Sequence, residues 1–170
     1  MQRQDRVGLR RLCWLLSFGW MGVIYWFSAQ DAEASAESSG SFMAFLLRLF
    51  RVQSSEAILT NTDTYSTIDF ILRKGAHFTI FTVLGLLLCT TISLYPNAIR
   101  LQKIVLPLSL GILYACIDEL HQYFVPGRAC QIRDVAIDTA GVLVGVLLTL
   151  GIGRLLQRRR QRIAGKTNTI

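Results

Sequence analysis

The stretch "RDVAIDTAGVLVGVLLTLGIG", residues 133 to 153, places two aspartates, Asp134 and Asp138, at the start of an apolar run that is long enough to cross a lipid bilayer. Such a run needs roughly 20 mostly apolar residues. At about 100° per residue, both aspartates share one stripe of a helix with Gly141 and Gly145, within about 40° to 60° of one another. Small residues four positions apart let two helices approach closely. The stretch therefore predicts a transmembrane helix that turns its carboxylates toward neighbouring helices and away from lipid.

The rest of the chain is also typical of a membrane protein. It is 52% hydrophobic and only 17% charged, with a mean hydropathy of +0.41, which is too apolar for an ordinary soluble domain. Three further runs are long enough to span a bilayer: Leu12 to Phe27, Gly75 to Tyr95 and Ile104 to Phe124. We therefore expect an all-α integral membrane protein, a four-helix transmembrane bundle in one domain of residues 1–170, with spans at about residues 10–28, 72–95, 103–124 and 134–154.

Basic residues gather near both ends of the chain and in the loop between the second and third spans. This side of the membrane collects twelve of the 18 basic residues: Arg3, Arg6, Arg10, Arg11, Arg100, Lys103, Arg154, Arg158, Arg159, Arg160, Arg162 and Lys166. An excess of Lys and Arg marks the cytoplasmic side of a membrane protein, so we expect both termini in the cytoplasm. The net charge of +7 then reflects topology. The basic tail of residues 154–170 is expected to touch anionic lipid, and no nucleic acid is predicted as a partner.

A long outer loop, residues 28–70, separates the first two spans. Its serine-rich beginning lacks the apolar content to fold alone. Residues 42–52, "FMAFLLRLFRV", have apolar side chains at the spacing of one helical face, which predicts an extracytoplasmic amphipathic helix lying along the membrane interface. The polar residues 60–70 that follow are expected to form a turn, with Thr67 or Asp69 capping the second transmembrane helix.

Polar side chains occur at the outer end of every predicted span. They are Ser28 and Gln30 in the first, Lys74 and His77 in the second, Asp118, Glu119, His121 and Gln122 in the third, and Asp134 and Asp138 in the fourth. Residues three or four apart are neighbours on a helix, so Lys74 lies beside His77, and Asp118 beside Gln122. Glu119 is turned about 100° from that stripe, toward a different partner or the interface. The four helices thus deliver their polar groups to one depth.

An ionisable group inside a membrane span costs about 2.5 to 3.5 kcal/mol on insertion scales, so these groups should be paired, hydrated or used. We expect Lys74, Arg128 and Arg133 to pair with Asp118, Asp134 and Asp138. A tight turn at Pro126 and Gly127 would hold Arg128 over the other groups. An ion-pair network that only joins the four helices is one interpretation. Against it, the polar groups outnumber what helix pairing needs.

At these residues the sequence resembles the VanZ-like family of small bacterial membrane proteins. The matching segments are "FSAQ" at 27–30, "DFILRKGAHFTIFTVLG" at 69–85, "DELHQYFVPGR" at 118–128 and "RDVAIDTAGVLVG" at 133–145. The family pattern leaves the position of His121 open, and it often has Tyr where this chain has Phe81. The resemblance implies a place in the bacterial cell membrane and a role in cell-envelope physiology, including resistance to the lipoglycopeptide teicoplanin, which the family's namesake confers. It implies no settled biochemical activity.

We expect an outward-facing site for a phosphate-bearing amphiphile, either a membrane lipid or a lipid-linked cell-wall precursor. Lys74 and Arg128 would hold the phosphate, with Gln122, Gln30 and Ser28 as further ligand-binding groups. His77 would move a proton, and Asp134 or Asp138 would orient it. Asp118 and Glu119 complete the predicted catalytic set. The alternative is non-catalytic binding of a lipid, a drug or an envelope partner at the same site, so the sequence does not decide whether the protein is an enzyme.

Other functions have less support in the sequence. A divalent cation on His77 and the nearby carboxylates is an alternative for the cofactor, although no tight ligand motif such as His-Glu-x-x-His is present. A transporter is disfavoured because the inward half of each span offers few polar groups. A homodimer could provide a polar path across the membrane between its two subunits. No disulfide framework is visible among the four cysteines, and we expect them to be small packing residues.

Overall fold

Four long helices make up the computed structural model, which describes residues 3–31, 37, 40–41, 62–128 and 130–167. They are α1 (Arg3–Ser28), α4 (Thr62–Ser93), α5 (Gln102–Gln122) and α6 (Ile132–Thr167). Each helix contains a segment that is long and apolar enough to cross a membrane. The described residues include no strand. The predicted all-helical, four-span fold is therefore confirmed for this part of the chain.

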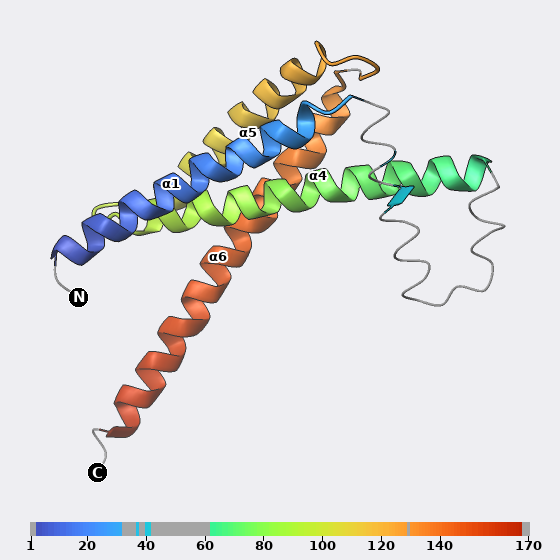
Figure 1. Cartoon of the computed structure of the whole chain (residues 1–170). Coiled ribbons are helices and arrows are strands. Elements are labelled where there is room, and N and C mark those ends of the chain that lie inside the picture. The colour runs from blue at the N-terminus through green and yellow to red at the C-terminus, as the bar shows by residue number, and fades with distance from the viewer. Residues whose placement is uncertain (1–2, 32–36, 38–39, 42–61, 129, 168–170) are drawn as a thin grey trace.

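Helices α4 and α6 cross at the centre of the fold, and glycines set how closely they approach (Figure 1). A Cβ atom added at Gly145 would lie 2.1 Å from the Thr82 carbonyl oxygen, and one added at Gly141 would lie 2.5 Å from the Phe78 carbonyl oxygen. These distances are too short for a side chain, so the two backbones are in direct contact. The stripe of Gly141 and Gly145 thus faces a neighbouring helix, as the sequence predicted.

The apolar core fills the space between this crossing pair and the helices α1 and α5. Ile24, Phe81, Leu84, Ala115 and Val142 are all fully buried. Elsewhere many large apolar side chains on the outer faces of α1, α5 and α6 are exposed, as are Phe70 and Ile71 on α4. An exposed apolar surface of this extent suits contact with lipid. The fold therefore buries a narrow core and exposes apolar outer faces.

Two helices are longer than their predicted spans. Helix α4 begins at Thr62, so the expected turn before residue 70 is wrong, and Thr67 and Asp69 lie inside the helix and cannot cap it. Residues 62–74 contain no Gly or Pro, and Arg73 forms an ion pair with Asp69 one turn earlier, which favours a continuous helix. The segment predicted as a basic tail is also helical, because α6 continues to Thr167.

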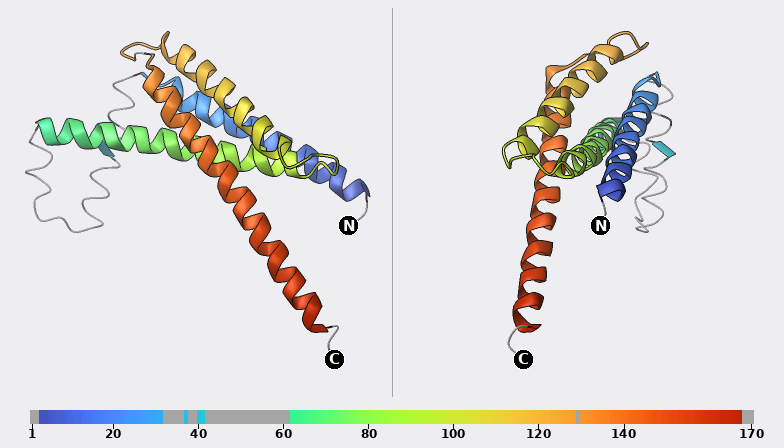
Figure 2. Two further views of the ribbon diagram at one scale, coloured as in Figure 1. Left: turned by 180° about the vertical axis from the view of Figure 1, so that it is seen from behind. Right: turned by 90° about the vertical axis from the view of Figure 1, so that its left-hand side faces the viewer.

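The C-terminal half of α6 extends away from the other three helices in every view (Figures 1 and 2). The predicted amphipathic helix of residues 42–52 lies outside the described residues. All four cysteines are free, and only Cys89 is buried, so a packing role in the core fits Cys89 alone.

Candidate functional site

The predicted site residues meet at one end of the bundle, where α1 and α5 end and α6 begins (Figure 1). We call this the site end. Eight of these side chains form a set that we call the polar cluster: Ser28, Lys74, His77, Asp118, Glu119, Gln122, Asp134 and Asp138. Six of the eight are buried, and only Lys74 and His77 are partly exposed. Each helix therefore contributes polar groups to one depth of the fold.

Asp118 is held in place by two neutral donors. The Ser28 hydroxyl, at the end of α1, donates a hydrogen bond of 2.9 Å to Asp118 Oδ2. The Gln122 side-chain amide donates a second bond of 2.9 Å to the same oxygen. Asp118 is 2% exposed, so these bonds fix the orientation of a buried carboxylate. The pairing of Ser28 with α5 also ties the end of α1 to the bundle.

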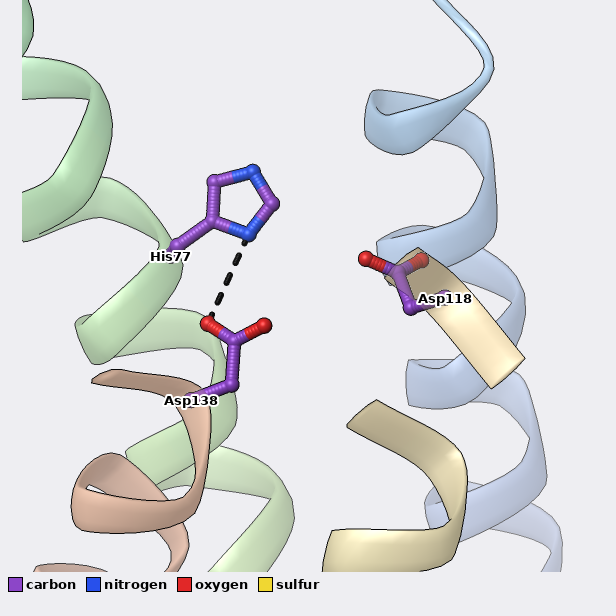
Figure 3. Close-up of side chains that lie close together, drawn as sticks. All are labelled: His77, Asp118 and Asp138. Atoms are coloured by element: carbon purple, nitrogen blue, oxygen red, sulfur yellow. Dashed lines mark ion pairs between the residues drawn. The ribbon is translucent and has the colours of Figure 1, made fainter. Parts of the chain in front are cut away.

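His77 and Asp138 face each other across the contact between α4 and α6 (Figure 3). His77 Nδ1 lies 3.6 Å from Asp138 Oδ1, within ion-pair range when the imidazole is protonated. Asp138 is fully buried, and neither of its carboxylate oxygens has a hydrogen-bond partner among the described residues. A buried carboxylate without partners is costly. Asp138 is therefore the least satisfied group of the polar cluster.

The ion pairs differ in part from those expected. Lys74 pairs with Asp134 as predicted, and Arg133 Nε lies 4.0 Å from the other oxygen of that carboxylate. No Lys or Arg of the described part of the chain lies within ion-pair distance of Asp118 or Asp138, so that expectation is wrong for these two aspartates. Their neighbours are Ser28, Gln122 and His77, because the basic residues reach only the edge of the cluster.

Arg128 follows a tight turn between α5 and α6. The Arg128 N–H donates to the Val125 carbonyl over 3.2 Å, and Gly127 has φ of 74°, which fits a type II turn with Pro126 ahead of the glycine. The side chain donates to the Phe27 carbonyl over 3.4 Å. Partial burial lowers the pKa of the Arg128 guanidinium, and the nearby Asp118 acts in the opposite direction. Arginine titrates so far above neutrality that Arg128 remains a cation.

Glu119 faces the start of α6 instead of lipid. Its Oε2 accepts a 2.9 Å hydrogen bond from the Gln131 N–H, one residue before the helix begins. A carboxylate is favourable at this position because the helix dipole is positive at its N-terminus. The residue is 1% exposed, and its Oε1 has no hydrogen-bond partner within the described residues. Of the two orientations left open by the sequence, a separate partner is the one observed.

Two candidate residues stand apart from the polar cluster. Gln30 is half-buried in the bend after α1, and no hydrogen bond joins it to the other candidates in the part of the chain described. His121 packs its ring against Tyr25, with centroids 4.5 Å apart.

The sequence analysis missed Tyr114, whose hydroxyl donates to the Met21 carbonyl over 2.5 Å. Its position one helical turn before Asp118 was the available signal.

The arrangement combines a buried acid–base centre with cations at its edge. We call Lys74, Arg128 and Arg133 the basic rim. Lys74 and Arg133 both lie over the Phe70 ring, 5.6 and 5.0 Å from its centroid. Below them, His77, Asp118 and Asp138 each offer one potential metal-ligand atom, and these atoms lie within 4.8 Å of one another. Such a site can attract an anion, move a proton or hold a cation.

One comparison with known proteins identifies a family for this chain. The model of the VanZ/LLP1 family matches residues 13–155, which include α4, α5, most of α1 and α6, and the whole polar cluster. The chain matches no curated protein and no solved structure. Since the family model covers most of the sequence, the chain belongs to the VanZ/LLP1 family.

Proposed function

We propose that the polar cluster is an outward-facing site of a bacterial cell-membrane protein with both termini in the cytoplasm. The site binds the headgroup of a phosphate-bearing amphiphile, such as a phospholipid or a lipid-linked cell-wall precursor, and carries out acid–base chemistry on it. The protein then acts in cell-envelope physiology, with glycopeptide resistance as one outcome of that activity.

The observation that carries this proposal is the position of the His77–Asp138 pair beside the basic rim. Asp138 approaches Nδ1 of the imidazole, so Nε2 is the nitrogen that a ligand can reach, and His77 remains one-fifth exposed. A carboxylate in this position orients the imidazole ring. Arg128 and Arg133 lie at the adjacent edge, where a guanidinium can bind phosphate through two hydrogen bonds.

An apolar groove supports an amphiphile as the ligand. It has a volume of about 230 Å³ and lies between α1, α4 and α5, lined among others by Trp14, Leu84, Tyr114 and Ile117. Tyr114, which lines the groove, lies one helical turn before Asp118 on the same face of α5, so one end of the groove approaches the polar cluster. A ligand with its headgroup at the basic rim can therefore place an acyl chain in this groove, where its apolar surface replaces lipid contacts.

Binding is tested with the purified full-length chain and two short-chain probes, dihexanoyl phosphatidic acid and the dihexanoylglycerol that lacks the phosphate. Native mass spectrometry should detect the phosphatidic acid on the protein and little of the neutral probe. A charged hydrogen bond contributes about 1.5 to 3 kcal/mol, so Arg128→Gln should weaken binding about tenfold or more. Arg154→Gln, a change of the same chemistry on the exposed far part of α6, is the control. Equal binding of both probes contradicts the proposal.

Chemistry is separated from simple capture by His77→Ala. If the site is catalytic, this variant should still bind the phosphatidic acid. Bacteria that express the variant should, however, lose any teicoplanin resistance that the wild-type chain gives them. Loss of binding and phenotype together would instead favour the non-catalytic reading, in which the cluster holds a lipid, a drug or an envelope partner. Retention of both would exclude His77 from the mechanism.

A further inference from the structure

The charges of the buried centre do not balance within the described residues. Asp118 and Asp138 are 2% and 0% exposed, yet among the residues that the structure describes His77 is the only titratable group within ion-pair distance of either one, and Arg128 acts on Asp118 only from beyond that distance. Lys74 is engaged by Asp134. A buried carboxylate needs a counter-charge or a proton, since the bare anion is strongly disfavoured away from water. One imidazolium compensates at most one of the two carboxylates.

The unpartnered atoms of this centre are directed toward one another. Both oxygens of Asp138 and the Nδ1 of His77 lack a hydrogen bond in the described chain. Figure 3 shows His77 and Asp138 on one side and Asp118 on the other, with their polar ends turned to the same space. One potential ligand atom from each residue lies within 4.8 Å of the other two. Neighbouring ligand atoms at about 2.0 to 2.5 Å from one metal ion lie about 3 to 4 Å apart, so a small movement of these side chains would bring them onto one ion.

Asp118 also has the support that metal ligands usually have. Ser28 and Gln122 both donate to its Oδ2, which leaves Oδ1 without these bonds and fixes the plane of the carboxylate. Hydrogen bonds of this kind orient ligating carboxylates, and their loss commonly weakens metal binding 10- to 100-fold, on the order of 1.4 to 2.8 kcal/mol. Asp118 is thus preorganised, whereas Asp138 supplies an open carboxylate.

We propose that His77, Asp118 and Asp138 bind a divalent transition-metal ion, Mn²⁺ or Zn²⁺. One imidazole nitrogen with two carboxylates favours these ions over Ca²⁺ and Mg²⁺, which prefer all-oxygen sites. The charge of the ion balances the two carboxylates. Three protein ligands leave at least one coordination position for another donor.

The open position extends the proposed function and rests on it. A phosphate oxygen held by the basic rim is the expected additional ligand, and the ion would polarise that phosphate. With the ion bound, His77 acts as a ligand through Nδ1, so this inference refines its role from proton carrier to metal ligand. Binding of the ion itself does not depend on the amphiphile.

The first experiment measures metal on the purified full-length protein in detergent. After removal of metal by a chelator, the protein is titrated with Mn²⁺ or Zn²⁺ alone, and bound metal is quantified by elemental analysis. About one ion per chain should bind. Co²⁺ should also bind and give a visible absorption spectrum typical of mixed nitrogen and oxygen ligands. No stoichiometric binding of any of these ions would overturn the proposal.

Asp138→Asn is the decisive variant, with Asp69→Asn as its matched control. Asp69 is also a buried aspartate at the site end, but its carboxylate pairs with Arg73 and takes no part in the proposed centre. Asp138→Asn should weaken metal binding at least about tenfold and remove the Co²⁺ spectrum, whereas Asp69→Asn should leave both unchanged. Asparagine removes a buried charge, so the metal-free Asp138→Asn protein should melt at or above the temperature of the metal-free wild type. Equal metal affinity of the two variants would overturn the proposal.

Two further measurements keep the outcomes distinct. If Asp138→Asn does not fold, His77→Gln provides the same test, because it removes a ligand at a partly exposed position. The amphiphile is measured with chelator present, so that phosphatidic acid binding depends on the basic rim alone. Metal binding without amphiphile binding would refute the proposed function only. Amphiphile binding without metal binding would refute the ion site only.

Discussion

Single residues show which parts of the site the sequence could predict. Lys74 was expected to pair with one of three aspartates and pairs with Asp134, because helical spacing placed both at the same depth. Of the two neutral partners of Asp118, Gln122 follows from the same spacing, but Ser28 could not be derived in this way. The Ser28 contact depends on the rotation of α1 and α5 about their own axes, which places Ser28 Oγ 2.9 Å from Asp118, and helical spacing within one segment carries no such information.

The Lys74–Asp134 pair leads to a prediction at this scale. Removal of one member of a buried ion pair costs about 3 to 5 kcal/mol, because the other charge stays buried without its partner. The Lys74 side chain is 23% exposed and Arg133 remains 4.0 Å from Asp134, and we therefore expect a smaller cost, in which Lys74→Met lowers the free energy of unfolding by about 2 to 3 kcal/mol. The double variant with Asp134→Asn should recover most of this loss. Denaturation in mixed micelles measures both. Additive losses in the double variant would contradict a coupled pair.

Whole helices were predicted more reliably than their ends. The apolar runs identified all four helices, because span length and hydropathy report directly on the bilayer. The ends of α4 and α6 were misjudged because polarity was taken as the end of a helix, whereas Thr62 to Asp69 and Arg154 to Arg162 are polar and helical. Hydropathy alone does not distinguish water-exposed turns of a helix from a loop. The absence of Gly and Pro from these two segments is what allows the helix to continue.

The contact between α4 and α6 gives the second prediction. In Gly145→Ala the new Cβ would meet the Thr82 carbonyl at 2.1 Å, so the two backbones must separate, and overpacking of this kind costs about 1 to 3 kcal/mol. Gly151→Ala is the matched control on the same helix, because its Cβ would meet nothing within 4 Å. It should be neutral or stabilising by up to about 1 kcal/mol. Thermal melting in detergent compares the two variants, and equal melting temperatures would show that the helices do not pack here.

Across the whole molecule, the buried carboxylates gather at one end, beside the basic rim, and other basic residues occupy the opposite end. The site end holds the carboxylates, while the other end brings the start of α1 to the end of α4, where Arg10 lies over the Tyr95 ring at 5.0 Å and Trp14 donates to its hydroxyl over 3.1 Å. Arg100 and Lys103 belong to that end as well. This separation matches the distribution of basic residues along the sequence. The orientation in the membrane therefore has two alternatives: the site end faces either the outside of the cell or the cytoplasm.

The orientation is tested with single cysteines and a maleimide that does not cross membranes. Cys130 is exposed in the connection between α5 and α6 at the site end, and it is kept while Cys13, Cys89 and Cys116 are changed to alanine. A second variant lacks all native cysteines and carries Asn97→Cys in the exposed connection between α4 and α5. Because basic residues favour the cytoplasm, intact spheroplasts should label Cys130 at once and Asn97→Cys only after permeabilisation. The opposite pattern would place the polar cluster at the cytoplasmic face, where an outward-facing lipid precursor could not reach it.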